Sequence, residues 1–425
     1  MSCLHYLSAD PSEPEAYAEL KTRLEEIDRT IDNPHNYLYY LATPPLLYGV
    51  IPRHLKAEGL NREGDGFRRI VVEKPFGYDL SSALELNRIY LDAFREEQIY
   101  RIDHFLGKET VQNILALRFA NSVFEPLWNR NYIDYVEITA VENMGIGTRG
   151  GFYDGVGTLR DMVQNHLAQL LAVTAMEPPA AFDASGFRNE VVKVYQSLTP
   201  LTGEDIRHSV VRGQYMASEG RKGYREEEQV PALSRTETYL AMRLELNNWR
   251  WGGVPFYIRT GKQMPTKVSE IVIHFKPAPY SLFRCEGGTC PVPNRLVIRI
   301  QPNEGIVLRL GMKKPGEGFE VLPMDMDFSY AELGRLPTED AYARLIEDCI
   351  AGDPTLFIRS DAVESGWRFF DPILKYWQDV PECPLYGYPA GSWGPLEADS
   401  LVARQGASWT NPCKNLTNTH LYCEL

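Results

Sequence analysis

The sequence of 425 residues lacks several features that would place it in a specialised class of protein. It has no run of about 18 apolar residues, so we expect no membrane-spanning helix. It also has no excess of positive charge, because 57 acidic residues against 44 basic ones leave a net charge of −13. Nucleic acid and anionic membranes attract basic surfaces, so we expect neither as a partner. An anionic small molecule would need a local cationic pocket.

The cysteines also lack a pattern. No Cys-x-x-Cys occurs and no His/Cys pair has zinc spacing, so the sequence predicts no metal site. An odd, scattered set is typical of reduced thiols, and no basic, apolar leader opens the chain, so we expect a cytoplasmic protein. The cysteines are Cys3, Cys285, Cys290, Cys349, Cys383, Cys413 and Cys423.

What is present is the composition of an ordinary globular protein, with 44% hydrophobic and 24% charged residues and a length that allows two or three folding units. Residues 1–100 alternate between helix and strand patterns, which favours a parallel, doubly wound (Rossmann) α/β domain. The successive patterns span residues 13–31, 37–42, 46–58, 70–73 and 81–94.

Residues 101–425 have a different pattern. Helical spacing covers 109–120 and 157–176, and two further helices are expected near Thr338 and with Ser360 as N-cap. Strand patterns dominate the rest, which predicts a larger α+β domain with a big, mainly antiparallel sheet packed by helices. These strands are expected at 133–141, 208–215, 237–247, 254–260, 269–275, 295–301 and 305–312.

The segment Arg101–Glu109 contains a candidate phosphate site. His104 and Lys108 are four residues apart, so on a helix they share one face near free backbone N–H groups. The plainer interpretation is an exposed helix start with ordinary ion pairing.

His166 is the candidate general base. In a helix over 157–176 it lies among apolar residues, which fits either a core histidine or a buried neutral imidazole that accepts a proton. Its second nitrogen then needs an acceptor. Asp161 would lie about 140° away on an α-helix, so a carboxylate from elsewhere is required, and Asp103 is available.

Two strand ends carry lysines. Lys74 follows the buried strand ending at Glu73, where ligands of doubly wound sheets bind, and the proline after it predicts a fixed turn. Lys262 ends another strand, and Lys267 follows it; either suits a phosphate, although the spacing alone is weak evidence. The Gly-x-Gly-x-x-Gly run at 145–150 is rejected as a dinucleotide motif, because the glycines that follow predict a loop instead of a helix start.

Together these segments resemble glucose-6-phosphate dehydrogenase, in order and over almost the whole chain. The family oxidises β-D-glucose 6-phosphate at C1 and passes hydride to NADP⁺, giving 6-phosphogluconolactone in the first step of the oxidative pentose phosphate pathway. The matching segments are Glu73–Gly77, Arg101–Glu109, Arg149–Tyr153, Arg160–Leu167, Trp251–Phe256, Arg259–Lys262, Gln301–Glu304, Lys313–Gly316 and Gly394–Asp399.

The resemblance implies roles for individual residues. His166 is similar to the family's general base and Asp103 to the carboxylate that orients it. Lys74 resembles a lysine shared by sugar and nicotinamide, and Tyr48 resembles a coenzyme contact. The other residues similar to sugar-phosphate ligands are His104, Lys108, Glu142, Asp161, Lys262 and Lys267. A homodimer or homotetramer is also implied.

The chain departs from the family pattern in three places. Phe105 replaces a frequent tyrosine, which removes one hydroxyl from the phosphate site. The first strand and glycine-rich pyrophosphate loop of the coenzyme domain have no counterpart, so the sequence leaves the choice between NADP and NAD open. Arg299 fits a second, structural NADP⁺ site, but Val307 and Trp393 do not, so no structural NADP⁺ is expected.

Two other interpretations compete with an active dehydrogenase. The first is a truncated, coenzyme-deficient protein that binds sugar phosphate or serves in dimerisation. The second is a dehydrogenase of the glucose–fructose oxidoreductase type, which shares the Glu-Lys-Pro strand end. The segments Arg101–Glu109 and Asp161–His166 argue against the second.

Overall fold

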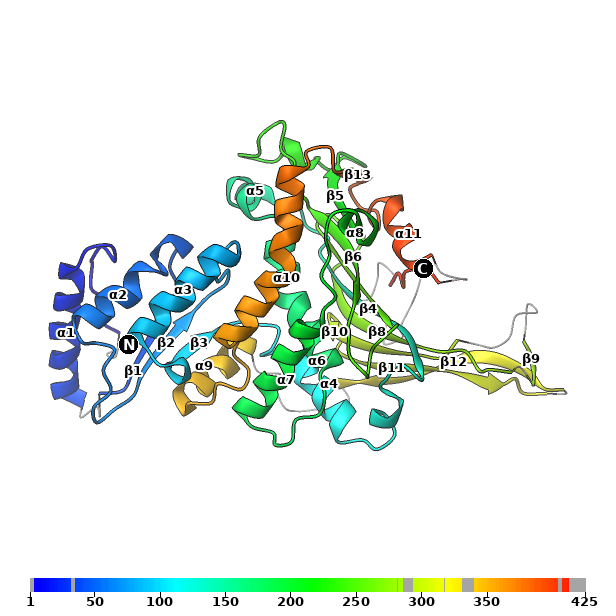
Figure 1. Cartoon of the computed structure of the whole chain (residues 1–425), viewed down its shortest axis with the longest axis horizontal. Coiled ribbons are helices and arrows are strands. Elements are labelled where there is room, and N and C mark those ends of the chain that lie inside the picture. The colour runs from blue at the N-terminus through cyan, green and yellow to red at the C-terminus, as the bar shows by residue number, and fades with distance from the viewer. Residues whose placement is uncertain are drawn as a thin grey trace. The chain divides into compact units, whose positions relative to one another are not determined.

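The computed structural model describes residues 4–31, 35–280, 282–285, 293–316, 318–330, 340–403 and 407–412 (Figure 1). The chain forms two compact units, each built from separate stretches of sequence. The first unit comprises residues 1–107, 179–192 and 339–368, and the second comprises 108–178, 193–338 and 369–425. The helices α7 (Ala184–Ser197) and α10 (Ser360–Asp379) each contribute residues to both units.

The first unit contains a three-stranded parallel sheet in the order β1-β2-β3. Its strands are β1 (Tyr37–Leu41), β2 (Arg68–Val72) and β3 (Ile99–Arg101). Helices connect them, with α2 (Val50–Ala57) after β1 and α3 (Leu80–Ala93) after β2. Ile70 and Val71 are fully buried, as expected for a central strand covered on both faces. The predicted doubly wound α/β arrangement is confirmed.

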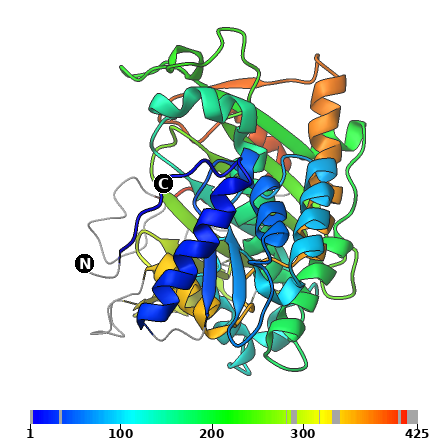
Figure 2. The same ribbon diagram turned by 90° about the vertical axis from the view of Figure 1, so that its left-hand side faces the viewer.

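Local capping fixes the helices of this unit. Asp79 and Ser82 form a reciprocal capping box at the start of α3, which satisfies backbone N–H groups that have no partner inside the helix. Helix α1 (Glu15–Ile31) lies in front of the strands in Figure 2. Helix α9 (Ala341–Ala351) comes from much later in the chain and completes the unit.

The second unit is organised around a ten-stranded mixed sheet in the order β13-β5-β6-β7-β4-β8-β10-β11-β12-β9. Most neighbouring strands are antiparallel, but β4 pairs with β7 in parallel. The strands are β4 (Ile133–Val141), β5 (Val210–Met216), β6 (Tyr239–Glu245), β7 (Pro255–Gly261), β8 (Val268–Phe275), β9 (Arg284–Cys285), β10 (Arg295–Gln301), β11 (Gly305–Lys313), β12 (Glu320–Ser329) and β13 (Tyr386–Pro389). The predicted large, mainly antiparallel sheet is confirmed.

Helices of this unit include a long irregular segment. The chain runs from α5 (Gly150–Thr158) through a π-helix (Leu159–Leu167) into α6 (Ala168–Ala175). Gly157 interrupts α5 with a φ of 72°. The prediction of one regular helix over 157–176 is therefore wrong in its centre, because π-helical hydrogen bonding replaces the α-helical pattern there.

Other helices are short. The described residues of this unit also form α4 (Glu109–Phe119), α8 (Glu204–Ser209) and α11 (Asp399–Val402). The sequence did not predict β12, β13 or α7. The expected helix start near Thr338 lies outside the described residues, and α9 begins at Ala341 with Asp340 as its N-cap. Ser360 is the first residue of α10 rather than its cap.

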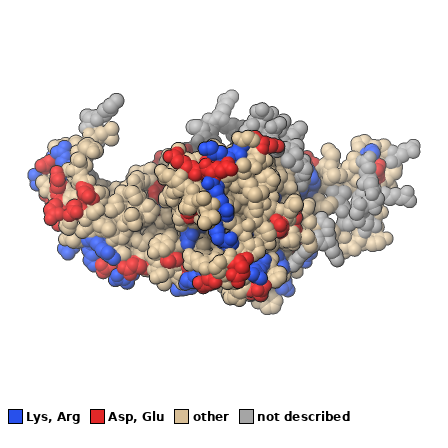
Figure 3. Space-filling model, turned by 90° about the horizontal axis from the view of Figure 1, so that it is seen from above, with Lys and Arg blue, Asp and Glu red and all other residues tan. Residues whose placement is uncertain are grey.

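Charged side chains of both signs are distributed over the face shown in Figure 3, including α1 at the left-hand end of the view. On α1, Arg23 pairs with Glu26 at 2.8 Å, an exposed contact of small energetic value. Among the described helices, none combines the length and apolar character needed to cross a bilayer.

Candidate functional site

Three neighbouring strands of the large sheet bring predicted site residues to one edge. Strands β4 and β7 are parallel, and Val141 pairs with Gly261, so the next residues of each strand, Glu142 and Lys262, emerge side by side. Strand β8 runs antiparallel to β4 and begins opposite Val141, which places Lys267, directly before β8, at the same edge. The register of the sheet thus gathers one carboxylate and two lysines, and we call this region the site edge.

Lys262 lies at the centre of the site edge. Its ammonium group pairs with the carboxylate of Glu142 and lies 3.2 Å from an oxygen of Asp161. Only 6% of the Lys262 side chain is exposed, whereas Lys267 is exposed. Two carboxylates around one buried ammonium satisfy a charge that would be costly to bury alone. Three predicted residues are therefore in direct contact.

Tyr153 forms one wall next to this cluster. The Lys262 ammonium lies 5.6 Å from the centre of its ring. Burial, together with the nearby charge of Asp161, raises the pKa of the Tyr153 hydroxyl well above its usual value. The hydroxyl therefore stays protonated at neutral pH, where it can act as a hydrogen-bond donor.

Gln301 extends the site edge and was not predicted as a site residue. It is the last residue of β10 and pairs with Ser269 of β8. Its amide nitrogen donates to the Ser269 hydroxyl at 2.9 Å, and its amide oxygen accepts from the Lys108 ammonium at 2.6 Å. The run Gln301–Glu304 was noted in the sequence, but only the register of the sheet shows that it meets Lys108.

Lys108 itself differs from its predicted setting. It is the N-cap of α4, and residues 102–107 before it are not helical. The expectation that His104 and Lys108 share a helix face is therefore wrong. The chain turns at residues 103–107 before α4 begins, so a helical spacing of four does not apply.

His166 lies within the π-helix and is 1% exposed. The argument that separated it from Asp161 assumed an α-helix, in which residues five apart point in different directions. In a π-helix residues five apart are joined by backbone hydrogen bonding and lie on adjacent turns. The exclusion of Asp161 as the hydrogen-bond partner of His166 therefore rested on the wrong helix geometry. In the structure Asp161 forms an ion pair with Lys262.

The π-helix begins on a buried carboxylate. The backbone N–H of Leu159 donates to Glu237 at 3.0 Å, and the Thr158 N–H and hydroxyl both donate to the Glu237 carbonyl oxygen, at 3.1 and 2.9 Å. Burial raises the pKa of Glu237 above its ordinary value. Glu237 thus fixes the entry of the segment that carries Asp161 and His166.

The glycine run at 145–150 was predicted to lie in a loop, but its last residue, Gly150, is the first residue of helix α5. The loop context on which the rejection of a dinucleotide motif was based is therefore wrong. A Cβ added at Gly150 would lie 2.0 Å from the Glu228 carbonyl oxygen, and one at Gly145 would lie 2.7 Å from Glu227. Atoms of Glu228 and Glu227 therefore crowd two of these glycines, whereas an added Cβ at Gly147 would have no atom within 4 Å.

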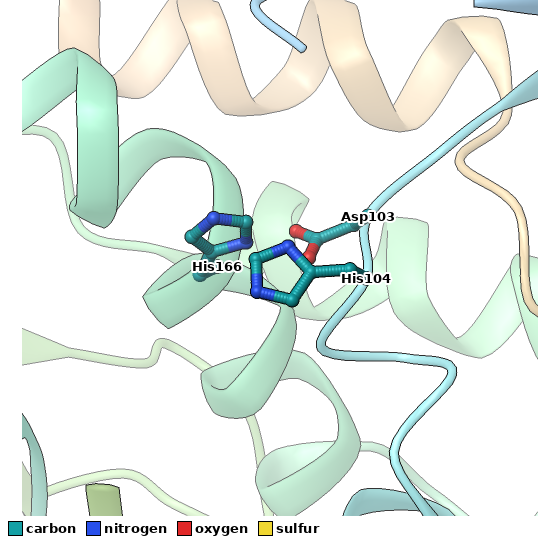
Figure 4. Close-up of side chains that lie close together, drawn as sticks. All are labelled: Asp103, His104 and His166. Atoms are coloured by element: carbon teal, nitrogen blue, oxygen red, sulfur yellow. The ribbon is translucent and has the colours of Figure 1, made fainter. Parts of the chain in front are cut away.

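In the first unit, the candidate residues lie at the carboxyl ends of β2 and β3. Val72 pairs with Arg101, and the Ile102 N–H donates to the Val72 carbonyl at 3.0 Å, so the segments after both strands are adjacent. Asp103 is 1% exposed, and its carboxylate accepts the Phe105 N–H at 3.0 Å. Figure 4 shows Asp103 and His104 on the segment after β3, and His166 on the helical segment of the second unit.

Glu73, which precedes Lys74, is the centre of a group of phenols in this unit. Its carboxylate accepts a hydrogen bond from Tyr40, and the Tyr342 hydroxyl lies close to it. Tyr48 is 2% exposed, and burial, with Glu73 nearby, raises its pKa to about 12. The Lys74–Pro75 peptide bond is cis. Glu73 and Tyr342 were not predicted as site residues.

The residues considered for a second nucleotide site are engaged within the protein. Arg299 forms a two-point ion pair with Asp327, one contact being 3.1 Å. Val307 is 1% exposed, and Trp393 stacks on the guanidinium of Arg259 at 4.7 Å.

Comparisons with known proteins agree on one family. A family model described as "Glucose-6-phosphate dehydrogenase, NAD binding domain" matches residues 1–113, and one described as "Glucose-6-phosphate dehydrogenase, C-terminal domain" matches residues 115–410. The chain is 53% identical over 415 residues to a glucose-6-phosphate 1-dehydrogenase of Aggregatibacter actinomycetemcomitans, covering 97% of this chain and 83% of the relative. It is 49% identical over 427 residues to that of Treponema pallidum, covering 99% and 83%.

Solved structures give the same result. A glucose-6-phosphate dehydrogenase in complex with its substrate glucose 6-phosphate matches with a TM-score of 0.87 at 35% identity, covering 96% of this chain and 82% of the other. A glucose-6-phosphate 1-dehydrogenase from Mycobacterium avium matches with a TM-score of 0.82 at 38% identity, covering 97% and 83%.

Proposed function

The chain belongs to the glucose-6-phosphate dehydrogenase family, and we propose that His166 is the general base of its reaction. The enzyme oxidises glucose 6-phosphate at C1 with a nicotinamide coenzyme. The C1 hydroxyl proton passes to the His166 imidazole, the C1 hydride passes to the nicotinamide ring, and a C1 carbonyl remains as the lactone. The observation that carries this assignment is an imidazole 1% exposed, on a segment anchored by Glu237.

Asp103 is the proposed orienting carboxylate. It is almost fully buried, and the Phe105 N–H fixes one of its oxygens at 3.0 Å, so its direction is set by the backbone. A carboxylate that accepts an imidazole N–H fixes the tautomer of the base and stabilises the imidazolium that forms. Asp161, the other candidate by spacing, is held by Lys262.

Most of the proposed sugar-phosphate contacts belong to the site edge and its neighbour Lys108, and His104 belongs to the first unit. Lys108 and His104 serve the phosphate, with Lys262 and Lys267 as further cations. Glu142 and Asp161 accept hydrogen bonds from sugar hydroxyls. Before the sugar binds, Lys262 balances their charges and holds the two carboxylates in position.

The coenzyme is proposed to be NADP, with NAD as the alternative, and to lie with residues 1–100, while residues 101–425 bind the sugar phosphate. Tyr48 and Lys74 are the proposed contacts, since both lie in the loops that follow parallel strands. A second, structural NADP is not part of the proposal, because Arg299 already has Asp327 as an ion-pair partner.

A second copy of the chain is the proposed partner of the β11–β12 hairpin, which projects from the sheet in Figure 1. Directly opposed residues of an antiparallel pair share one face. One face of this hairpin is entirely apolar, formed by the pairs Ile306–Phe328, Leu308–Met326, Leu310–Met324 and Met312–Leu322. The other face carries the ion pairs Arg309–Asp325 and Arg299–Asp327.

The exposure of this apolar face supports a homodimer or homotetramer. Met312, Met324, Met326 and Phe328 are 54%, 54%, 64% and 41% exposed. A stable interface buries about 1,200–2,000 Å² in total, and these exposed side chains with their half-buried neighbours supply apolar surface to it from both copies. A face without charges is complementary to itself, so an identical copy related by a two-fold axis fits it.

A cytoplasmic location is also proposed. Cys349 and Cys383, the described cysteines whose side chains are placed, are both free and buried. Free thiols are typical of reducing compartments.

The decisive experiment replaces His166 by asparagine and measures coenzyme reduction with glucose 6-phosphate. We expect kcat to fall by about 10²–10⁴-fold, the usual contribution of a general base, with the affinity for the sugar phosphate nearly unchanged. The matched control is His208→Asn, because His208 is exposed on α8. Unchanged turnover in His166→Asn would reject the assignment. Binding of glucose 6-phosphate by wild type without coenzyme reduction would instead favour the coenzyme-deficient alternative.

A further inference from the structure

We infer that Tyr342 is a positioning residue that holds the His104 ring and the Glu73–Lys74 loop in one arrangement. The inference deepens the proposed function, because it concerns residues proposed to contact sugar phosphate and coenzyme. Tyr342 comes from α9, more than two hundred residues after the loops it contacts, and it lies in the same compact unit.

The aromatic ring of Tyr342 packs on His104. The two ring centres are 6.2 Å apart and the planes differ by 8°, which is an offset parallel stack. The His104 ring also contacts the Phe105 ring, at 5.0 Å and 62°. Two aromatic rings therefore contact His104, and both limit the rotation of its side chain.

The hydroxyl of Tyr342 acts at the neighbouring strand end. It lies close to the carboxylate of Glu73, which accepts a hydrogen bond from Tyr40. Burial raises the pKa of Tyr342, and the Glu73 carboxylate adds to the effect, so the phenol remains a donor at neutral pH. Glu73 is adjacent to Lys74, so one side chain contacts the loops after both β2 and β3.

The start of α9 is built to keep Tyr342 in place. The Asp340 side chain accepts the Tyr342 N–H at 2.8 Å and caps the helix. The helix also lies very close to the loop after β3. A Cβ on Gly107 would be 2.7 Å from the Ala341 carbonyl oxygen and 3.1 Å from Leu345, which is fully buried. Glycine at 107 is what allows this approach.

Tyr342 itself is 37% exposed. A residue that served only to pack the core would be buried. Tyr342 instead combines partial exposure, a stack on a proposed phosphate ligand and a hydroxyl close to Glu73, which precedes a proposed coenzyme ligand. Its two contacts use different parts of the side chain. The ring serves His104 and the hydroxyl serves Glu73, so two substitutions can separate them.

The test compares Tyr342→Phe with Tyr342→Leu in the full chain. Tyr342→Phe keeps the ring, so we expect the KM for glucose 6-phosphate to stay within about twofold while kcat falls by about threefold to tenfold. Tyr342→Leu also removes the stack, so the KM for glucose 6-phosphate should rise by about threefold to tenfold. The control is Tyr132→Leu, because Tyr132 is exposed to a similar extent, 49%, and belongs to the other unit.

Two further measurements separate positioning from folding and from the proposed chemistry. The His104 ring proton resonance, assigned by its loss in His104→Asn, should shift in Tyr342→Leu and not in Tyr342→Phe. Calorimetric binding of glucose 6-phosphate without coenzyme should weaken in Tyr342→Leu even if His166 proves not to be the base. The inference is overturned if both Tyr342 variants keep wild-type KM, kcat and His104 resonance, or if their losses simply follow a lowered melting temperature.

Discussion

Glu237 accepts a hydrogen bond from the backbone N–H of Leu159 at 3.0 Å, at the first residue of the π-helix that carries Asp161 and His166. Burial raises the pKa of this carboxyl. Gly157 permits the contact, because its φ of 72° turns the chain toward Glu237. The geometry of the proposed base therefore depends on a residue 71 positions away in sequence.

Gly157→Ala should be destabilising and should lower activity. The added Cβ would lie 2.5 Å from the Glu237 carboxylate oxygen, on a backbone that L-residues rarely adopt. Strain of this kind costs about 1–3 kcal/mol. The matched control is Gly155→Ala in the same helix, where no atom lies within 4 Å of the added Cβ and stability should be unchanged or raised by up to about 1 kcal/mol. Denaturant unfolding and kcat measure both effects; equal behaviour of the two variants would contradict this account.

Lys262→Met should weaken sugar-phosphate binding. The substitution leaves Glu142 and Asp161 facing each other without the ammonium between them. Like charges then repel, and one proposed cation is lost, so the KM for glucose 6-phosphate should rise by at least about tenfold. Lys222→Met is the control, because Lys222 is exposed and distant from the site edge in sequence. A KM within twofold of wild type would remove Lys262 from the site.

The pairing of Glu137 predicts how stability depends on acid. Burial alone would raise the pKa of Glu137, but the hydrogen bond and charge of His274, the Thr410 N–H and Arg259 outweigh it and hold the pKa below 4.5. As the pH falls, Glu137 is protonated in the unfolded chain before it is protonated in the folded protein. Its contribution to the free energy of unfolding is therefore complete above pH 4.5 and is lost as the pH falls below that value. Glu137→Gln should lower the free energy of unfolding by about 1–3 kcal/mol at neutral pH. Below pH 4.5 the free energy of unfolding of this variant should fall less steeply with pH than that of wild type.

This prediction is measured by denaturant unfolding of both proteins at several pH values. Thr410, which donates its N–H and hydroxyl to Glu137 at 2.9 Å each, provides a second variant. Thr410→Val removes the hydroxyl donor and should lower the free energy of unfolding by less than Glu137→Gln does. Parallel curves for wild type and Glu137→Gln across acid pH would be the contrary result.

Met326→Glu should dissociate the proposed assembly. The substitution places a carboxylate at the centre of the apolar β11–β12 face, opposite Leu308. In a two-fold interface the charge is buried twice without a partner, at a cost of several kcal/mol. Light scattering after size exclusion should show a smaller species. Leu233→Glu is the control, since Leu233 is 87% exposed outside this face; an unchanged mass for Met326→Glu would place the interface elsewhere.

Much of the fold follows from local sequence patterns. The β-branched run Ile70–Val72 specifies a buried strand, and the spacing of apolar residues in 13–31 specifies a helix. Each pattern depends only on residues that are a few positions apart in the sequence. The β12 strand was not predicted, although its alternation of methionine and aspartate has the period of two that is typical of a strand. The π-helix was missed because hydrogen-bond spacing leaves no signature in an apolar pattern.

In the candidate site, too, some features follow from local sequence and others depend on contacts between distant segments. Sequence motifs pointed to His166, Lys262 and Glu142 without any contact between segments. The contact of Lys108 with Gln301 depends on which strands are neighbours in the large sheet, and that order is set by packing over the whole chain. Tyr342 and Glu73 belong to distant segments that neither motif nor spacing connects.

The deficit of positive charge argued against nucleic acid and anionic membranes as partners, and it meant that any anionic ligand would need a local cationic site. The sequence determined the residue types of that site, because the type of each side chain sets its charge and its hydrogen-bonding groups. Their arrangement was decided by tertiary structure. The register of β7, β4 and β8 places Lys262 between two carboxylates, and a π-helix replaces the α-helix on which the sequence argument relied. Neighbouring strands and hydrogen-bond spacing are properties of the folded chain, since they arise only when distant segments pack together.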